Sequence, residues 1–260
     1  MMGHIVCLAL ALVAAPPSFA AAKKKAAAAS GIAASTSTAV AAPSSLDVST
    51  APLRTVDELK AHFLQIDGAL RGMTARFVQT VRISQAGLTY RVEGTVHYQK
   101  PDKLRMDMTS PERDATPPER QTVVADGKSV WVHRKTYNQV IETKLDAMRR
   151  SDPLIGNLLD LGNYSRLTER YDVSFDSGTL GVTLRPKGEV PRFTLRLWLK
   201  GTSRFPSETQ LAIEAMQVQT VFEDIRFNPE LDPALFTFVA PADAEVYRDF
   251  KIPAIGGEPQ

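Results

Sequence analysis

The sequence is almost without cysteine: its 260 residues contain one, Cys7. Cys7 lies inside a short apolar run and follows His4-Ile5-Val6, not the small residues that usually precede a lipid-modified cysteine. A chain cleaved after this run would have no disulfide and no lipid anchor of its own. Such a composition is compatible with the periplasm.

The sequence also lacks an excess of charge of either sign. Lys and Arg total 31 and Asp and Glu total 29, which gives a net charge of +2. The charges are interspersed, and no basic stripe with interleaved aromatic residues occurs. Nucleic acid is therefore not an expected partner.

Long hydrophobic runs are missing, apart from residues 5–15, which are too few to span a bilayer. Pro16-Pro17 and the small-x-small triplet Ser18-Phe19-Ala20 follow this run, so residues 1–20 are predicted to be a secretory signal peptide. A buried core helix is the alternative, but a low-complexity tract follows directly. The n-region has no Lys or Arg, which departs from the usual signal. The cleaved chain is expected to be a soluble periplasmic protein.

Chemistry-bearing motifs are absent as well. Beyond His4, the histidines are His62, His97 and His133, at no metal-ligand spacing, and no nucleophile or phosphate-binding motif occurs. Glu223-Asp224 lies in a strand pattern, which is expected to point the two carboxylates to opposite faces. We therefore predict no catalytic residue, no metal site, no cofactor and no enzymatic activity.

Residues 21–53 are a tract rich in Ala, Ser, Thr and Pro, which predicts a disordered tether. Lys23-Lys24-Lys25 could contact anionic lipid head groups, although a plain linker is the favoured interpretation. The folded domain is assigned to residues 54–250 and a flexible tail to residues 251–260.

The domain begins with a predicted helix. Thr55 and Glu58 have the spacing of a capping box, and apolar residues follow at helical spacing. These are Val56, Leu59, Phe63, Ile66 and Leu70. From Met73 to Ile83 the pattern changes to period two, which predicts a strand.

The segment from Glu93 to Trp131 alternates polar and apolar residues between turns at Pro101-Asp102 and Asp126-Gly127, which predicts antiparallel strands. Further strands are expected at 139–143, 171–175, 181–185, 192–200, 208–214, 216–227 and 237–239. Residues Leu145–Leu161 predict an apolar helix, entered or kinked at Pro153. Because no βαβ repeat occurs, we predict an α+β fold with one strongly curved antiparallel sheet of ten or eleven strands.

Leu104, Met106 and Met108 share one strand face, and Met148 lies on the central helix. Flexible thioether side chains suit a surface that adapts to variable apolar shapes. Plain core packing is the alternative for any one of them.

Five short motifs occur in order between residues 55 and 247. They are Phe77-Val78-Gln79, Gly94 with Lys100 to Met106, Asp126 to Trp131, Tyr137-Asn138-Gln139, and Phe236-Thr237-Phe238 with Pro241 and Val246. On these motifs the chain resembles the LolA family, the periplasmic carriers of outer-membrane lipoproteins.

The resemblance implies a half-barrel of about eleven antiparallel strands, with helices that cover its concave apolar face as a lid. Lipoprotein acyl chains would bind in this cavity. The residues expected to line it are Phe77, Val92, Val96, Leu104, Met106, Met108, Val130, Leu158, Leu197 and Phe222.

The resemblance also implies a lid latch at Lys100. In the family an arginine directly before the hairpin proline bonds to the lid backbone and keeps the empty cavity closed. Lysine offers a point charge instead of a planar fork of donors. Met106 stands where the family often has tryptophan, and Arg113–Glu119 lengthens a hairpin. These departures leave open a divergent paralogue that carries another lipid.

As a carrier, the protein would be a monomer that receives lipoprotein from an inner-membrane lipoprotein-release ABC transporter complex and delivers it to an outer-membrane acceptor lipoprotein. A second hypothesis is a regulatory sensor of the same fold, which binds stray lipids or lipoproteins and then controls a membrane signalling protein.

Overall fold

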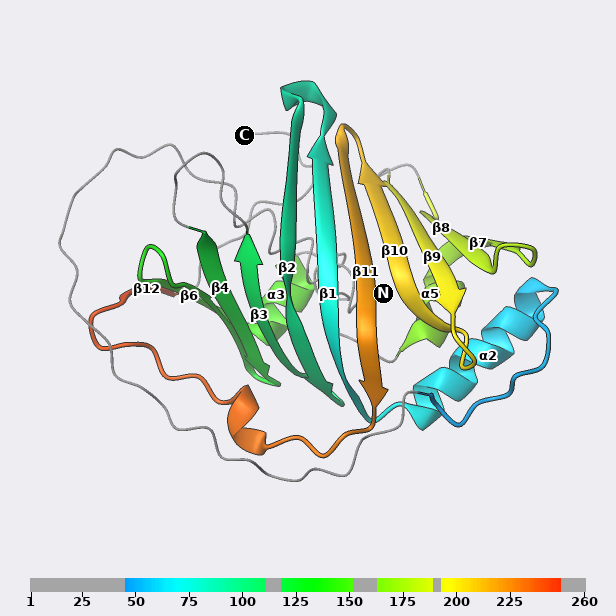
Figure 1. The fold of residues 1–260 in the computed structure, drawn as a ribbon, viewed down its shortest axis with the longest axis horizontal. Helices are drawn as coiled ribbons and strands as arrows, with labels where there is room; N and C mark the ends of the chain where they lie inside the picture. Colours follow the sequence, from blue (N-terminus) through cyan, green and yellow to red (C-terminus); the bar gives the residue numbers. More distant parts are fainter. Residues whose placement is uncertain (1–44, 111–117, 152–162, 189–192, 249–260) are drawn as a thin grey trace.

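The computed structural model describes residues 45–110, 118–151, 163–188 and 193–248. They form one open, curved sheet of twelve strands in the order β12-β6-β5-β4-β3-β2-β1-β11-β10-β9-β8-β7 (Figure 1). The strands are β1 Gly72–Ile83, β2 Leu88–Gln99, β3 Lys103–Ser110, β4 Glu119–Asp126, β5 Ser129–Arg134, β6 Gln139–Lys144, β7 Tyr171–Asp176, β8 Gly181–Pro186, β9 Phe193–Lys200, β10 Phe205–Ile213, β11 Met216–Phe227 and β12 Glu245–Arg248. The prediction of a single curved antiparallel sheet is confirmed, but the described sheet has twelve strands where ten or eleven were predicted, and β12 pairs parallel to β6.

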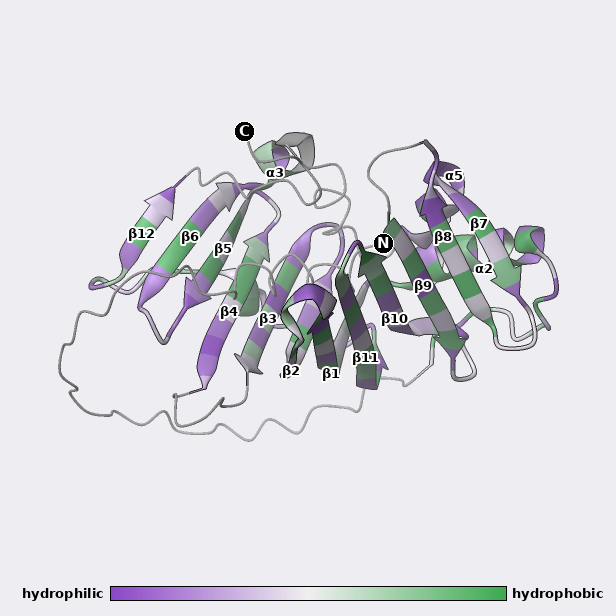
Figure 2. Ribbon diagram, turned by 90° about the horizontal axis from the view of Figure 1, so that it is seen from above, coloured by the Kyte–Doolittle hydropathy of each residue, from purple (hydrophilic) through white to green (hydrophobic). Residues whose placement is uncertain are grey.

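The helices lie on the inner side of this sheet. Seen from above, the strands follow an open arc, with α3 Leu145–Ser151 and α5 Tyr164–Arg170 inside it (Figure 2). Helix α2, Val56–Ala69, packs against α5 and the edge strand β7. No helix in the described ranges is long and apolar enough to cross a membrane.

The capping box at the start of α2 forms as predicted. The Glu58 backbone N–H donates to Thr55 Oγ1 at 3.2 Å, and the Thr55 N–H donates to Glu58 Oε2 at 2.9 Å. Two backbone N–H groups at the helix start are satisfied in this way. The described part of the central helix is α3, while Pro153 and the rest of the predicted helix lie outside the described residues. Helix α5 was not predicted.

The long strands β1 and β2 form the centre of the sheet, and Gly94 of β2 allows β3 to approach closely. Gly94 lies opposite Phe77 on one side and Met108 on the other. A Cβ at Gly94 would lie 2.1 Å from the carbonyl oxygen of Asp107, so any side chain here would push β3 away.

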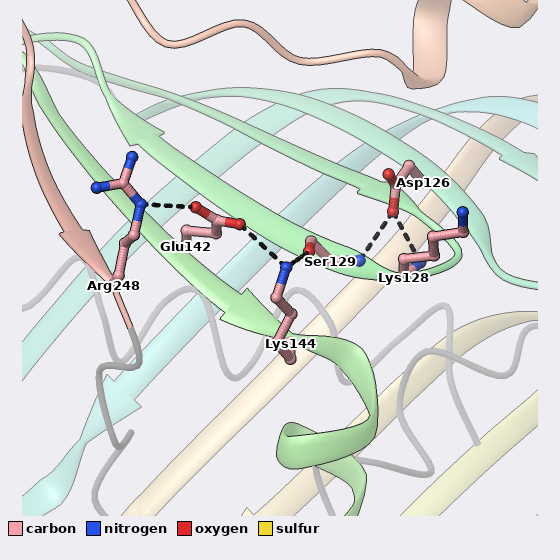
Figure 3. A network of polar contacts seen from close by, with 6 residues as sticks. All are labelled: Asp126, Lys128, Ser129, Glu142, Lys144 and Arg248. Carbon is pink, nitrogen blue, oxygen red and sulfur yellow. Dashed lines mark hydrogen bonds and ion pairs between the residues drawn. The ribbon is translucent and has the colours of Figure 1, made fainter.

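The hairpin between β4 and β5 forms at Asp126-Gly127 as predicted. The Asp126 carboxylate accepts hydrogen bonds from the backbone N–H groups of Lys128 and Ser129, at 2.7 and 2.8 Å (Figure 3). Gly127 has φ +94°, a conformation that favours glycine. The Asx turn and the glycine together fix the hairpin.

The predicted strand at 237–239 is wrong. Residues 237–239 are in no helix or strand. They follow a 3-10 turn, η3 Pro233–Phe236, and the last strand that the structure describes is β12, which pairs parallel to β6. Phe236 is buried, and the Phe238 ring lies 6.0 Å from the Trp131 ring on the outer face of the sheet. The alternating pattern Phe236-Thr237-Phe238 therefore reflects two aromatic rings that pack against the sheet, and not a strand within the sheet.

Ion pairs join β12 to the rest of the sheet. Arg248 Nε lies 3.3 Å from Glu142 Oε2, and Lys144 Nζ lies 3.4 Å from Glu142 Oε1 and 3.0 Å from Ser129 Oγ (Figure 3). Because these groups are mostly exposed, the ion pairs help to align β12 with β6 and add little to the free energy of unfolding.

The packed chain begins earlier than the predicted end of the tether. Leu46 and Leu53 are buried in the core, although the tether was expected to reach residue 53. The Leu46 N–H donates to Ser203 Oγ at 2.6 Å, which fixes this segment to the β9–β10 turn.

Candidate functional site

The concave face of the sheet carries one continuous apolar surface. Phe77 lies opposite Phe222 on β11, and Val96 lies opposite Met106 on β3. Residues opposite each other in a sheet point to the same face. The pairing of the strands therefore places these apolar side chains side by side on the concave face. Leu197, on β9, belongs to the same core cluster.

Nine of the ten predicted cavity residues lie on this face, and each is at most 7% exposed. They are Phe77, Val92, Val96, Leu104, Met106, Met108, Val130, Leu197 and Phe222. The tenth, Leu158, lies outside the described residues. The structure therefore brings these nine side chains together on one face of the sheet.

Two polar side chains within this face satisfy each other. Gln79 and Thr220 lie opposite each other on β1 and β11 and are buried. Gln79 Nε2 donates to Thr220 Oγ1 at 3.0 Å. Since a buried polar group without a partner would be costly, this bond offsets the burial of Gln79 and Thr220 beside the apolar side chains.

Helices α2 and α5 cover the β7–β11 half of the face. Leu59, Phe63 and Ile66 of α2 are buried, and the Phe63 ring lies 5.7 Å from that of Tyr164 on α5. The Tyr164 ring in turn lies 5.6 Å from Phe205 of β10. This row of aromatic contacts runs from α2 through α5 to the sheet.

Helix α3 contributes Leu145 and Met148 to the same buried cluster. The Leu145 N–H donates to the Lys128 carbonyl oxygen at 2.9 Å, which fixes the start of α3 to the β4–β5 hairpin. The β6 end of the sheet is therefore covered by a different helix from the β7 end.

Lys100 joins the β2–β3 turn to α2. Its Nζ donates to the backbone carbonyl oxygen of Asp67, and its backbone N–H donates to the Arg71 carbonyl oxygen at 2.8 Å. Lys100, the residue predicted as a latch, thus contacts backbone at the end of α2.

Asp67 extends this contact to α5. Its carboxylate accepts hydrogen bonds from the backbone N–H groups of Tyr164 and Ser165, at 2.7 and 2.8 Å. These two donors belong to the first turn of α5, where a carboxylate is favourable. One residue of α2 therefore binds Lys100 through its backbone and α5 through its side chain.

Asn228 binds the other side of the α2 terminus. Its Oδ1 accepts the N–H of Arg71 at 2.7 Å, and its Nδ2 donates to the Ala69 carbonyl oxygen at 2.9 Å. Sequence reasoning missed Asp67, Asn228 and Tyr164, because each acts on a partner roughly a hundred or more positions away and lies in no local motif.

The Tyr164 hydroxyl is buried and has no hydrogen-bond partner in the part of the chain that the structure describes. Burial, followed by the charge of Asp67 and by Tyr98, raises the pKa of Tyr164 well above its usual value. The hydroxyl therefore stays protonated and remains a donor beneath the helices.

Histidines and carboxylates form no metal site in the described ranges. Burial lowers the pKa of His62, His97 and His133, which favours their neutral forms. This arrangement is typical of packed histidines.

The prediction that Glu223 and Asp224 point to opposite faces is wrong. Arg76 lies 3.4 Å from Glu223 Oε2 and 2.6 Å from Asp224 Oδ2. A register shift between Thr74 and Arg76 leaves Asp224 at φ +51°, so strict alternation fails there. The two carboxylates form an exposed ion-pair cluster with one guanidinium group.

Comparison with known sequences finds similarity to lipoprotein carrier proteins. Residues 68–239 match the family model described as outer membrane lipoprotein carrier protein LolA. The chain is 24% identical over 172 residues to the outer-membrane lipoprotein carrier protein of Proteus mirabilis, covering 66% of this chain and 79% of that one. It is 28% identical over 195 residues to the protein of the same name from Methylobacillus flagellatus, covering 74% and 87%.

Among solved structures, one match is a LolA superfamily protein from Nitrosomonas europaea. The TM-score is 0.37 and the sequence identity 12%, with 72% of this chain and 99% of that chain covered.

Proposed function

The chain belongs to the LolA family of outer membrane lipoprotein carrier proteins, and from this membership we propose that it carries the acyl chains of lipoproteins on its concave face. The observation that supports this most is the continuous apolar surface across the sheet, which forms one buried cluster with side chains of the helices that cover it. An apolar face of this kind needs no reaction chemistry, since shielding alone is the activity.

The physical need for such shielding is large. Burying one CH₂ group contributes about 0.8 kcal/mol, so a sixteen-carbon chain represents on the order of 12 kcal/mol of apolar exposure in water. A carrier that removes this surface from water makes transfer between two membranes feasible.

We place the transfer in the periplasm, after removal of residues 1–20 as a signal peptide. In this scheme an inner-membrane lipoprotein-release ABC transporter complex supplies the cargo, and an outer-membrane acceptor lipoprotein receives it. The carrier acts as a monomer. Each of these partners follows from the family and not from a surface of this chain.

Lys100 acts as the lid latch in this proposal. Its bond to the Asp67 carbonyl holds α2 closed, and Asp67 makes α5 part of the same cover. When an acyl chain separates the helices from the sheet, the Lys100 contact breaks. A single hydrogen bond is weak enough to allow release as well as closure.

A photocrosslinking experiment tests the binding face. The photoreactive residue p-benzoylphenylalanine replaces Phe222 on the concave face or, as a matched control on the same strand, the exposed residue Gln217. The purified full chain is irradiated with a triacylated lipopeptide, and the products are read by mass spectrometry. Crosslinking at 222 and not at 217 is expected.

A transfer assay tests the carrier activity. The protein is incubated with inner-membrane vesicles that contain a lipoprotein, and then with outer-membrane vesicles. A protein that extracts no lipoprotein, delivers none and yields no bound lipid on extraction would contradict the proposal. Delivery without crosslinking at 222 would place the cargo on another surface.

A further inference from the structure

The sheet splits between β10 and β11 at the end nearest the β9–β10 turn. The last pair between the two strands is Glu208 opposite Val221. Beyond it, Phe205 still pairs with β9, and Phe227 still pairs with β1. The two strands therefore diverge while each keeps its outer neighbour, as Figure 1 shows.

Both strands are irregular where they diverge. The register of β10 against β9 shifts across Ser207, and that of β11 against β1 shifts across Asp224, which has φ +51°. A bulge adds a residue to one strand and bends it away from its ladder. Since an irregularity occurs on each strand at the same level, the split is part of the fold.

A pocket of about 300 Å³ lies in this split. Its lining includes Phe205, Phe222 and Phe227, each at most 5% exposed. The rings of Phe205 and Phe227 meet edge to face at 5.0 Å, so residues of both strands form one apolar wall. The Phe222 ring lies 6.2 Å from that of Phe77, which connects this wall to the concave face.

The charged groups at the rim of the pocket already have protein partners. Lys200 pairs with Glu208, and Asp224 lies 2.6 Å from Arg76. Ser203 and Ser207 of the lining carry no charge. An anionic or cationic ligand would therefore compete with existing ion pairs, whereas an uncharged apolar ligand would not.

The size of the pocket fits an alkyl segment. A cavity of about 150 Å³ lined by apolar side chains holds a benzene molecule, so about 300 Å³ has room for roughly ten carbons. A whole lipid would not fit in this volume. The end of one chain would.

We propose that the split between β10 and β11 is a binding subsite for the terminal segment of a long acyl chain, whose remaining carbons lie on the concave face. This inference rests on the proposed carrier function and adds to it a limit on chain length. Lipoproteins, phospholipids and free fatty acids share the alkyl chemistry that the subsite recognises.

The test compares the binding of fatty acids with short and long alkyl chains. Full-length wild-type protein, Ser207→Trp and the matched control Gln217→Trp are titrated with saturated fatty acids of eight and sixteen carbons. The indole at 207 would fill the pocket, and Gln217 is exposed on the same sheet. We expect Ser207→Trp to weaken binding of the sixteen-carbon acid at least about tenfold, the effect of losing two buried CH₂ groups. Binding of the eight-carbon acid should change less than about twofold, and Gln217→Trp should change neither.

Unchanged binding of the sixteen-carbon acid to Ser207→Trp, or an equal loss for both acids, would overturn the subsite alone. A wild-type protein that binds neither acid would overturn the carrier function as well. If Ser207→Trp does not fold, Ser207→Cys in a Cys7→Ala background is modified after folding with N-ethylmaleimide, and the same selective loss is expected. Repeating the titration with a triacylated lipopeptide and a phospholipid identifies which source of alkyl chain uses the subsite.

Discussion

At the scale of single residues, Lys100 is the side chain that joins the β2–β3 turn to α2. Its ammonium group reaches the Asp67 carbonyl oxygen at the end of α2. An arginine there could donate more than one hydrogen bond in a fixed plane, whereas lysine donates from a flexible stem. The lid of this protein should therefore open more readily than one closed by arginine.

Replacing Lys100 by alanine removes this contact. We expect the free energy of unfolding to fall by about 1 kcal/mol, and backbone amides of α2 and α5 to exchange with deuterium faster. Lys100→Arg should slow this exchange relative to wild type. The control Lys128→Ala removes an exposed lysine outside the lid and should leave exchange unchanged. Equal exchange in the two alanine variants would exclude a latch role for Lys100.

The histidines give the protein a predictable response to pH. Burial lowers the pKa of His62, His97 and His133 in the folded state, so near neutral pH the unfolded chain binds more protons than the folded one. Stability then rises with pH, and it is lost as pH falls below the unfolded histidine pKa of about 6.5 toward the lower folded values.

This dependence can be measured by urea unfolding between about pH 5 and pH 8. Wild type should lose stability toward pH 5, with each neutral histidine contributing at most roughly 1.4 kcal/mol per pH unit. His97→Gln cannot titrate and should have a smaller slope. A slope that His97→Gln leaves unchanged would mean that His97 does not contribute.

At the scale of elements, the N-terminal segment before α2 is part of the packed structure. Leu46 and Leu53 are buried, and the Leu46 N–H donates to Ser203. A chain that begins at residue 45 should therefore unfold at the same urea concentration as one that begins at residue 21. One that begins at residue 55 should lose about 3–6 kcal/mol, because two buried leucines are removed.

The double variant Leu46→Ala, Leu53→Ala in the longer chain is the matched control for this truncation. It should reproduce most of the loss without shortening the backbone. If the chain beginning at residue 55 is as stable as the longest one, the packing of residues 45–54 contributes nothing to the folded state.

Sequence patterns predicted the elements whose causes are local. Period two placed Val92 and Val96 on one face of β2, and Leu104 and Met106 on one face of β3, because alternation within a strand is a local property. The capping box at Thr55 was predictable for the same reason. The bulge at Asp224 was not, because it arises from the register of β11 against β1.

The hydrogen bonds that join α2 to α5 could not be predicted from the sequence either. Asp67 binds the start of α5 about a hundred residues away, and nothing in the seven-residue helix identifies its partner. The short motifs indicated the family, and the family match confirms that resemblance. They indicated the position of Lys100 but not the role of Asp67 in joining the two helices.

At the scale of the whole molecule, the sheet and its cover form one buried cluster. Side chains from α2, α5 and α3 pack into the same core as the concave face of the sheet. An acyl chain cannot reach that face unless some of these contacts separate. Binding should therefore include an opening step that precedes contact with the cargo.

Such an opening step limits the rate of uptake at high ligand concentration. In stopped-flow mixing of the lipid-free protein with a fluorescent fatty acid, the observed rate should rise and then reach a plateau set by opening. Lys100→Ala should raise the plateau by about fivefold, the rate equivalent of one hydrogen bond of about 1 kcal/mol, while Lys128→Ala should leave it unchanged. An observed rate that rises linearly without a plateau, and equally in both variants, would mean that the face is accessible without movement of the helices.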